Sequence, residues 1–553
     1  MQKLTEMDAS FLQQETVRTP MHISPVLVYD QSGRKDHPVR FKEILTTFER
    51  NLHKSGIFRR KLAGGAFGLD TPYWVEDPDF DLEFHVRHIA LPQPGDWRQF
   101  CIQLARLQAR GLDMRRPLWE AYVIEGLNKV QGLPQHSFAI LLKVHHAAID
   151  GISGAEIVTA IHSLTDEILP PPVADTWEGE SGPTDWQVWS QAYLNNLKRP
   201  ATFIDKVQHL VPAVIRANRK STDKGAAQRP PMVRCRFNGP VSSTRVTDAL
   251  IMDMQDIKAI RGAVEGTTVN DVIVSIVGGG MRKYLQSKDE LPETTLCCGA
   301  PINTRSERNS SSAGNQVSNM IISLATDVED PLERLRAVNH SALQSKAYAE
   351  ALGTSVLMDV SEMLTPQVLG WGMRTASLAT ASSNIPFPIH TIVSNVPGPQ
   401  VPLYLAGARL HTVMGMGPLL HGSGLFHAVF SAAGRITINF LSCREMLPDP
   451  AFYQQCLREA FEELREAAAA LATKPKARGK SRPKTGTRDL AGVRAKPGAK
   501  AKVKAKTKIK AKTKAKAKAK AKTKAKAGAK TLSGAAGKAK PKAKPKAKRP
   551  SRG

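Results

Sequence analysis

One short stretch of the chain, LLKVHHAAIDG at residues 141–151, decides how the first half of the protein folds. The apolar run from Phe138 to Val144 predicts a buried strand, and this strand ends in two adjacent histidines, His145 and His146. The Asp150-Gly151 pair that follows is typical of a tight turn, because glycine adopts backbone conformations closed to other residues. The sequence therefore predicts a strand that delivers an imidazole to a turn beside a cleft.

An imidazole in such a place suits proton transfer, because its unperturbed pKa of about 6.5 lies near neutral pH. His146 is therefore a candidate general base, and Asp150 is expected to fix the loop beside it. Two other interpretations stay open at this point. A histidine at the end of an apolar strand is often a buried structural residue, and His146 with Asp150 would supply two metal ligands, although no third ligand lies nearby in the sequence.

Working outward from this stretch, strands that alternate with helices predict an α/β architecture. Strands are expected at 21–30, 73–75, 121–125, 138–144, 296–301, 317–325, 389–395, 425–430 and 436–440. Helices are expected at 41–52, 100–107, 155–164, 257–265, 268–285, 331–349 and 451–470. Thr268 is the expected N-cap of its helix, and Gly278-Gly279-Gly280 indicates either close packing of that helix or its end.

Changes in composition divide the chain into four ranges. Residues 1–170 form a first α/β subdomain that carries the two histidines, and residues 233–473 form a second. Residues 171–232 are rich in Pro and Gly, and they predict a connecting segment of loops and helices. Residues 474–553 alternate Lys with Ala and Pro and contain almost nothing apolar to bury, so they are expected to be a disordered tail.

The charge of the chain is concentrated in that tail. The whole chain has a net charge of +28, and residues 474–553 hold 32 Lys and Arg against one acid, Asp489. The remaining residues therefore carry a net charge of about −3, which excludes a uniformly basic nucleic-acid-binding body. The tail itself fits three interpretations: binding to an anionic lipid surface, non-specific binding to nucleic acid, or an inert solubilising extension.

Cysteine usage indicates a reducing compartment, and hydropathy predicts neither a signal peptide nor a membrane span. The six cysteines form no C-x-x-C pair and suit no zinc site, so they are expected to be structural thiols. The N-terminus lacks the apolar core of a signal peptide, and no stretch reaches the roughly 18 apolar residues of a membrane span. We expect a cytoplasmic protein, soluble or peripherally bound.

Four further motifs accompany the histidine pair, and together they resemble a known family. His145 to Gly151 look like the HHxxxDG motif of CoA-dependent acyltransferases. The details are similar to the bacterial wax ester synthase/diacylglycerol acyltransferases within that superfamily. The matching segments are LTEMDASF at 4–11, PLW at 117–119, ND at 270–271 and SNVPGP at 394–399. The resemblance covers roughly residues 1–470 and leaves out the tail.

The resemblance implies a fold and a reaction. The fold would be two chloramphenicol-acetyltransferase-like subdomains, with mixed sheets flanked by helices and an active-site channel between them. An acyl-CoA thioester would meet a diacylglycerol or a long-chain alcohol there, and His146 would remove the hydroxyl proton. No acyl-enzyme, metal or cofactor would be needed, because acyl-CoA is itself a substrate.

The resemblance also implies roles for other residues. His145 would support the turn, and Asp150 would be structural, with Arg305 as its candidate partner or else a solvated surface charge. Asn270, Gly151, Trp119 and Leu118 would bind or border the substrates. The residues alone also allow a helix cap for Asn270 and a core position for Leu118 and Trp119.

The expected substrates are lipids, so the protein would associate peripherally with the inner membrane or with lipid inclusions. Residues 368–378 are either a core helix or a patch that touches that surface. Two rival functions stay open: a condensation-type transfer of acyl groups to an amine or a carrier-bound acceptor, and a non-enzymatic droplet or nucleoid scaffold that uses the tail.

Overall fold

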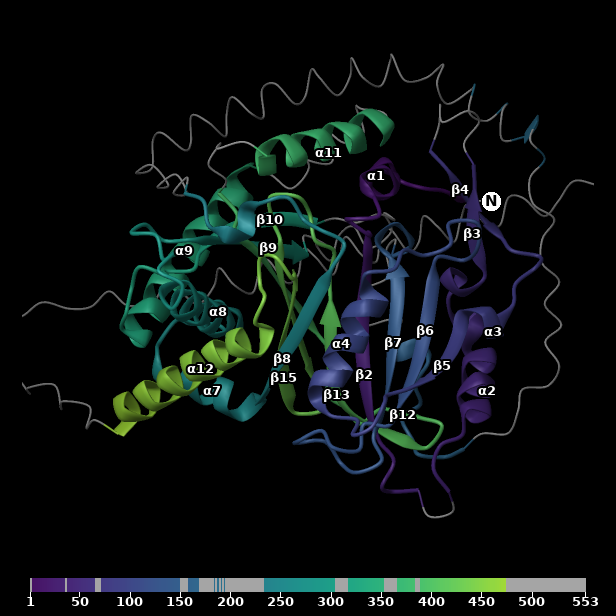
Figure 1. Cartoon of the computed structure of the whole chain (residues 1–553), viewed down its shortest axis with the longest axis horizontal. Coiled ribbons are helices and arrows are strands. Elements are labelled where there is room, and N and C mark those ends of the chain that lie inside the picture. Colours follow the sequence, from purple (N-terminus) through teal and green to yellow (C-terminus); the bar gives the residue numbers. More distant parts are fainter. Residues whose placement is uncertain are drawn as a thin grey trace, which may run out of the picture. The chain divides into compact units, whose positions relative to one another are not determined.

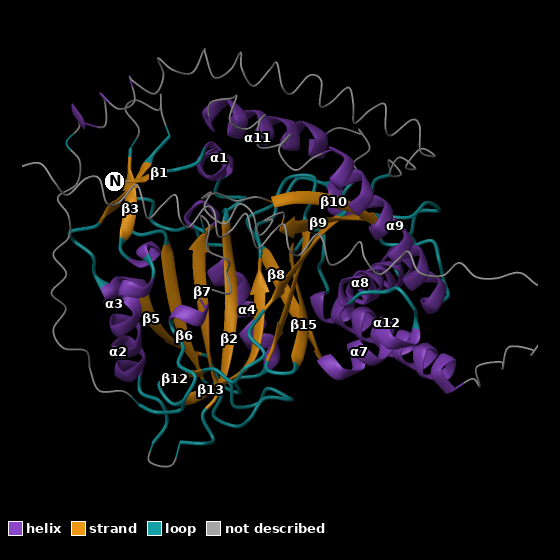
Figure 2. Ribbon diagram, turned by 180° about the vertical axis from the view of Figure 1, so that it is seen from behind, coloured by secondary structure: helices purple, strands orange, loops and turns teal. Residues whose placement is uncertain are grey.

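Two six-stranded mixed sheets with helices on their faces form the framework of the protein (Figures 1 and 2). The structure is a computed structural model. It describes residues 2–34, 37–64, 71–149, 158–168, 233–303, 317–352, 366–382 and 388–473, with a few single residues between 184 and 193. Residues 1–476 form one unit of the chain, and the second unit, residues 477–553, lies outside the described residues.

The first sheet has the strand order β12-β13-β2-β7-β6-β5. Its strands are β2 (His22–Asp30), β5 (Val86–Ala90), β6 (Trp119–Glu125), β7 (Phe138–His145), β12 (Tyr404–Leu405) and β13 (Ala408–Met416). The strand β7 lies near the centre, antiparallel to both β2 and β6, and all of its residues are buried. Apolar side chains on both faces of a sheet give a continuous apolar run, which is the pattern seen from Phe138 to Leu142.

Helices and a small sheet surround this first sheet. The helices are α1 (Glu6–Gln14), α2 (Phe41–Asn51), α3 (Leu82–His85) and α4 (Trp97–Gln108). The small sheet consists of β1 (Gln2–Lys3), β3 (Arg60–Ala63) and β4 (Tyr73–Glu76). In α2, Ile44 and Phe48 face the core while the opposite side stays polar, as the 3.6-residue period predicts.

The second sheet has the order β10-β9-β11-β14-β15-β8. Its strands are β8 (Arg245–Asp253), β9 (Cys297–Asn303), β10 (Val317–Ser323), β11 (Thr391–Pro397), β14 (Leu425–Ala432) and β15 (Arg435–Cys443). The helices of this half are α7 (Met254–Ala263), α8 (Val269–Gln286), α9 (Pro331–Leu352), α11 (Pro366–Ser382) and α12 (Pro450–Thr473). Helix α8 packs against α7, α9 and α12, whereas α11 stands apart from that group (Figure 1).

The close packing expected at the three glycines of α8 is confirmed. A Cβ at Gly278 would collide with the backbone oxygen of Leu324, and a Cβ at Gly279 would lie 2.8 Å from Cβ of Ala460. Both contacts are too short for any side chain. The glycines lie inside the helix and not at its end, so they let α8 approach its neighbours closely.

Two strands, β12 and β13, cross between the halves of the chain. Although β13 follows β11 in the sequence, it pairs antiparallel with β2 and so extends the first sheet, from Gly415 opposite Pro25 to Arg409 opposite Asp30. The sequence analysis did not predict a strand there. The predicted ranges 1–170, 171–232 and 233–473 stay predictions, and β13 shows that the two sheets do not divide at residue 233.

The predicted α/β class is confirmed, and every predicted strand appears with its ends shifted by a few residues. The predicted helix at 155–164 is described only from residue 158, where three helical residues are seen, and the connecting segment and the tail lie outside the described residues. Helix α1 and strand β8 were not predicted. All six cysteines carry free thiols, and no helix among the described residues is long and apolar enough to cross a bilayer.

The N-terminus of α8 carries a reciprocal cap formed by Thr268, which was predicted, and Asp271, which was not. Thr268 is the N-cap, as expected, and its hydroxyl accepts from the backbone N–H of Asp271 at 3.2 Å. The buried carboxylate of Asp271 accepts from the backbone N–H and the hydroxyl of Thr268, both at 2.8 Å, and from the amide of Asn339 at 2.9 Å.

Replacing Asp271 with Ala leaves these three donors without their acceptor. We expect the free energy of unfolding to fall by about 1–3 kcal/mol, the cost of buried polar groups left unpaired. Urea denaturation followed by circular dichroism measures the loss. The control is Asn270→Ala, which changes a partly exposed neighbour outside the cap and should leave stability unchanged; equal losses in both variants would contradict the assignment.

Candidate active site

The histidine pair leaves β7 at a point fixed by backbone hydrogen bonds from both neighbouring strands. The N–H of His145 donates to the carbonyl of Leu118 at 3.0 Å, just before β6, and the N–H of His146 donates to the carbonyl of Met21 at 2.8 Å, just before β2. A 3₁₀ turn, His146–Ala148, follows directly. The predicted strand and turn are thus present, and the position of each imidazole is set by the sheet.

His145 is a fully buried structural residue. Its Nε2 lies 2.6 Å from Oε2 of Glu15, the residue that ends α1, and its Nδ1 accepts from the N–H of Ala147 at 3.1 Å. Because Nδ1 accepts, the ring proton sits on Nε2 and donates to the carboxylate. The side chain therefore ties the turn to α1, which suits the supporting role predicted for it.

His146 is differently placed, because it is partly exposed and meets an aromatic ring. The ring of Phe11 on α1 lies over it with centroids 4.0 Å apart and the planes tilted by 32°. Burial of the ring, with a smaller effect from His145, lowers the pKa of His146 to about 4. The imidazole is therefore neutral at pH 7, and it can accept a proton.

The two nitrogens of His146 differ in access. Nδ1 is buried and has no hydrogen-bond partner in the described part of the chain. No hydrogen bond to Nε2 is found among the described residues, and His146 as a whole is partly exposed. The arrangement leaves Nε2 as the nitrogen that a substrate hydroxyl can meet.

Three predicted site residues, Asp150, Gly151 and Arg305, lie outside the described residues. Their predicted roles in fixing the loop and bordering the substrates stay predictions.

Leu118 and Trp119 lie in the core and have no exposed surface. The indole N–H of Trp119 donates to the carbonyl of Phe58 at 3.0 Å, and its ring packs against His85 with centroids 4.7 Å apart. Leu118 supplies the carbonyl that holds His145. Both residues support the strand ends beside the histidines, and their substrate-binding role stays a prediction.

Asn270 occupies the second position of α8 and is partly exposed. The cap of this helix is Thr268 with Asp271, so the helix-cap interpretation of Asn270 is wrong. Its predicted contact with substrate stays open.

Lys143, the third residue of the stretch 141–151, belongs to a buried charge cluster that no sequence pattern predicted. Its ammonium donates to the carbonyl of Arg110 at 2.7 Å and lies 3.6 Å from Oε2 of Glu120. Burial lowers its pKa to about 8, even though Glu120 raises it. Arg87 pairs with the same carboxylate at 3.2 Å, so the cluster braces β6 and β7 on the face opposite Val144.

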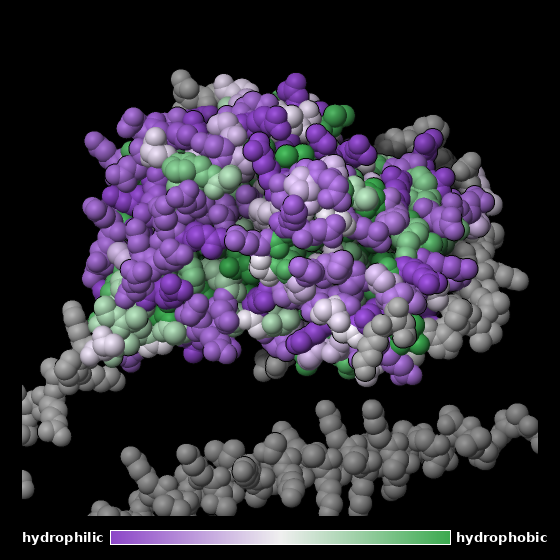
Figure 3. Space-filling view, turned by 60° about the horizontal axis from the view of Figure 1, so that its bottom comes forward, coloured by the Kyte–Doolittle hydropathy of each residue, from purple (hydrophilic) through white to green (hydrophobic). Residues whose placement is uncertain are grey.

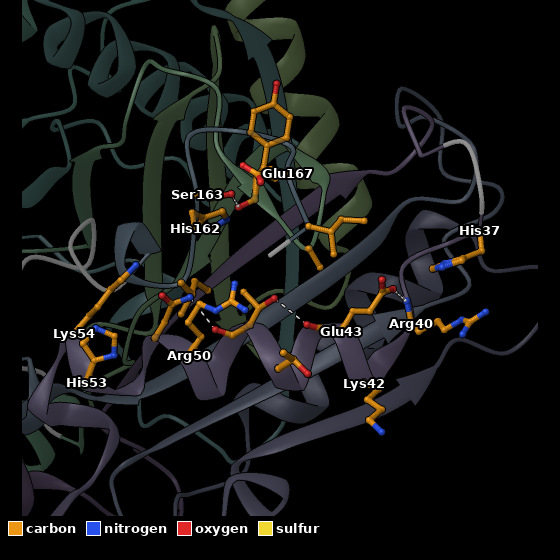
Figure 4. A pocket seen from close by; sticks show the side chains of 17 residues that line it. His37, Arg40, Lys42, Glu43, Arg50, His53, Lys54, His162, Ser163 and Glu167 are labelled. Carbon is orange, nitrogen blue, oxygen red and sulfur yellow. Dashed lines mark hydrogen bonds between the residues drawn. The ribbon is translucent and has the colours of Figure 1, made fainter. Parts of the chain in front are cut away.

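A cavity of about 630 Å³ lies at the other end of the first sheet (Figure 4). Its lining includes Arg50 on α2, Arg40 just before that helix and Lys54 just after it, with His162 opposite them. The hydroxyl of Tyr29, which pairs with Phe138 at the start of β7, donates to His162 at 2.9 Å. The histidine pair is seven residues further along β7, roughly 23 Å away at 3.3 Å per residue. This polar cavity is therefore separate from His146.

No cluster of three His, Cys, Asp or Glu side chains that could hold a metal ion occurs in the described ranges.

Glu15 and Phe11 are the site residues that sequence reasoning missed. Phe11 belongs to the N-terminal motif but had no assigned role, and Glu15 lies outside every motif, so only the folded position of α1 reveals them.

Comparison with known proteins places the chain among lipid-modifying enzymes. The family model of the wax ester synthase/diacylglycerol acyltransferase catalytic domain matches residues 4–273, and the model of the C-terminal domain of the same family matches residues 313–465. The matches thus span both sheets and end before the basic tail.

Two relatives and one solved structure agree with these models. A protein of Mycobacterium tuberculosis (strain CDC 1551 / Oshkosh), provisionally named a diacylglycerol O-acyltransferase, is 31% identical over 473 residues, covering 85% of this chain and 91% of the relative. A similarly named protein of Mycobacterium bovis (strain ATCC BAA-935 / AF2122/97) is 32% identical over 85% of this chain and 100% of the relative. The wax ester synthase/diacylglycerol acyltransferase from Marinobacter aquaeolei VT8 has a TM-score of 0.60 and 25% identity, over 85% of this chain and 100% of that one. The predicted fold of two subdomains is confirmed by this structure.

Removing the carboxylate of Glu15 tests how firmly α1 holds the turn. In Glu15→Ala, the buried Nε2–H of His145 loses its acceptor, and we expect the free energy of unfolding to fall by about 1–3 kcal/mol. Glu15→Gln keeps an acceptor oxygen, so it should restore most of that loss. Denaturation curves for both variants supply the measurement, and an unchanged curve for Glu15→Ala would show that the contact does not stabilise the fold.

Proposed function

The chain belongs to the wax ester synthase/diacylglycerol acyltransferase family and is an acyltransferase, and we propose that it esterifies a diacylglycerol or a long-chain alcohol with His146 as the general base. The acyl donor is acyl-CoA. The observation that carries this proposal is a neutral, partly exposed imidazole held at a fixed strand end, with one nitrogen open to a substrate.

In the proposed reaction, both substrates are bound before any bond changes. Nε2 of His146 takes the hydroxyl proton as the alcohol oxygen attacks the thioester carbonyl. The tetrahedral intermediate then collapses, its carbon–sulfur bond breaks, and the protonated imidazole returns the proton to the leaving CoA sulfur. The products are an ester and free CoA thiol, and the imidazole ends neutral. General-base catalysis contributes on the order of 10²–10⁴-fold, and the orientation of two bound substrates contributes more.

The surroundings of His146 support this role. A charged imidazole would be a poor base, and burial keeps the ring neutral at pH 7. His145 cannot share the task, because both of its nitrogens are engaged, by Glu15 and by Ala147. We assign His145 to positioning, Asp150 to fixing the loop with Arg305 as its candidate partner, and Asn270 and Gly151 to substrate contact.

Replacement of His146 tests the proposal directly. With palmitoyl-CoA and either hexadecanol or a diacylglycerol, we expect His146→Ala to lower the rate of CoA release by at least about 10²-fold. The control is His340→Ala, which changes an exposed histidine on α9 and should keep the wild-type rate. Unchanged release in a folded His146→Ala protein would rule out the base, and a parallel-line pattern in two-substrate kinetics would instead indicate an acyl-enzyme.

The pH dependence provides a second test. A base works only when unprotonated, so activity is lost as the pH falls through its pKa. Since burial lowers the pKa of His146 to about 4, we expect kcat/KM to stay level from pH 7 to about pH 5 and to fall below that. As a control, the enzyme is held at each pH and its activity is then measured at pH 7, which distinguishes protonation of the base from unfolding. A limb centred at pH 6.5 or above would contradict a neutral, enclosed base.

A further inference from the structure

Helix α11 lies outside the two layers of sheet and helix, on top of α1 (Figures 1 and 2). The contact is close, because a Cβ at Gly370 would lie 2.8 Å from the carbonyl oxygen of Ser10. The amide of Gln14 on α1 also reaches the sulfur of Met373 at 3.7 Å. One side of α11 therefore rests on the helix whose Phe11 covers His146.

The other side of α11 exposes large apolar side chains. Trp371 is 68% exposed and Leu378 is 43% exposed. Trp371 and Leu378 are seven residues apart, which places them on the same side of the helix two turns apart. The core interpretation of residues 368–378 is therefore wrong for the described side chains of this helix. Exposed apolar groups gathered on one helix mark an interaction surface.

Positive charge flanks this apolar side. Arg374 on α11 and Arg18, just after α1, are both exposed. The pKa of the nearby His421 is lowered first by burial and then by these two arginines. Their guanidinium groups therefore lie on the same part of the surface. The sequence of α11 contains no acidic residue. Arginines beside an apolar helix side complement anionic headgroups above an acyl layer.

Large apolar side chains are also exposed elsewhere in the described ranges. Figure 3 turns the end of the molecule away from α11 towards the reader, and that face is predominantly hydrophilic. The other exposed apolar groups include the pairs Trp186 with Tyr193 and Leu343 with Tyr348, and the single residues Ile102 on α4 and Phe452 on α12.

We propose that α11 is a docking helix that lies in the surface of an anionic phospholipid bilayer, with Trp371 and Leu378 inserted among the acyl chains. Arg374 and Arg18 face the lipid phosphates. The inference rests on the proposed function, because a lipid acceptor dissolves in the bilayer and not in water. Since α11 rests on α1, a docked enzyme holds the His146 end of the first sheet next to the layer that contains the acceptor.

The test uses the full chain and vesicles of phosphatidylcholine with phosphatidylglycerol, in about 0.5 M salt so that purely electrostatic binding by the Lys-rich segment is screened. The double variant Trp371→Ser/Leu378→Ser removes the inserted groups. We expect its vesicle affinity to fall by more than about tenfold, as the loss of two buried apolar side chains implies. The matched control, Leu343→Ser/Tyr348→Ser, removes exposed apolar groups from α9, 58% and 47% exposed, and should bind as the wild type does.

A second readout keeps the docking proposal separate from the chemistry. Vesicles with brominated acyl chains should quench tryptophan fluorescence in the wild type and much less in Trp371→Phe, which keeps an apolar ring.

Activity supplies a further readout. The double variant Trp371→Ser/Leu378→Ser should lose activity on a diacylglycerol in vesicles and keep activity on a medium-chain alcohol in solution. Equal quenching in the wild type and Trp371→Phe, or equal affinity in the double variant and its control, would overturn the proposal. If His146→Ala loses activity on the alcohol in solution, that result concerns the role of His146 as the base and does not test docking.

Discussion

The structure depends on the pairing of one buried strand, β7, between β2 and β6. Every residue of β7 is buried, so its register cannot slip without moving apolar side chains out of one core and into the other. That register places His145 opposite His22 and brings the N–H groups of the two histidines to the carbonyls of Leu118 and Met21. The geometry of the histidine pair is thus a consequence of strand pairing, and the side chains around the turn only refine it.

The two adjacent imidazoles acquire different chemistry from their surroundings alone. His145 is engaged at both nitrogens and becomes a link between the turn and α1. Burial lowers the pKa of His146, so its imidazole is neutral at pH 7. The same helix, α1, contributes to both outcomes, because Glu15 holds the first ring and Phe11 covers the second. The helix also carries α11 on its far side, so the active site and the exposed apolar residue Trp371 share one structural support.

Local patterns in the sequence predicted most elements of the fold, since buried strands and amphipathic helices leave periodic traces. The strands β14 and β15 and helix α8 are examples. The strand β13 was missed because its membership of the first sheet depends on pairing with β2, far away in the sequence. Contacts between distant segments have no local signature, and for the same reason Glu15 and the cluster of Lys143 with Glu120 were not foreseen. The motif around His146 predicted the proposed base because its chemistry lies within a few consecutive residues, whereas the solvent-exposed side of α11 became clear only from the packed structure.

The central claim is that Nε2 of His146 takes the proton of the acceptor hydroxyl. The most direct measurement is a crystal structure of the enzyme with a non-reactive thioether analogue of acyl-CoA and a long-chain alcohol. The account predicts the alcohol oxygen within about 2.6–3.2 Å of Nε2 and directed at the carbon that replaces the thioester carbonyl. An alcohol bound elsewhere, with Nε2 sealed from it by packed side chains, would contradict the account.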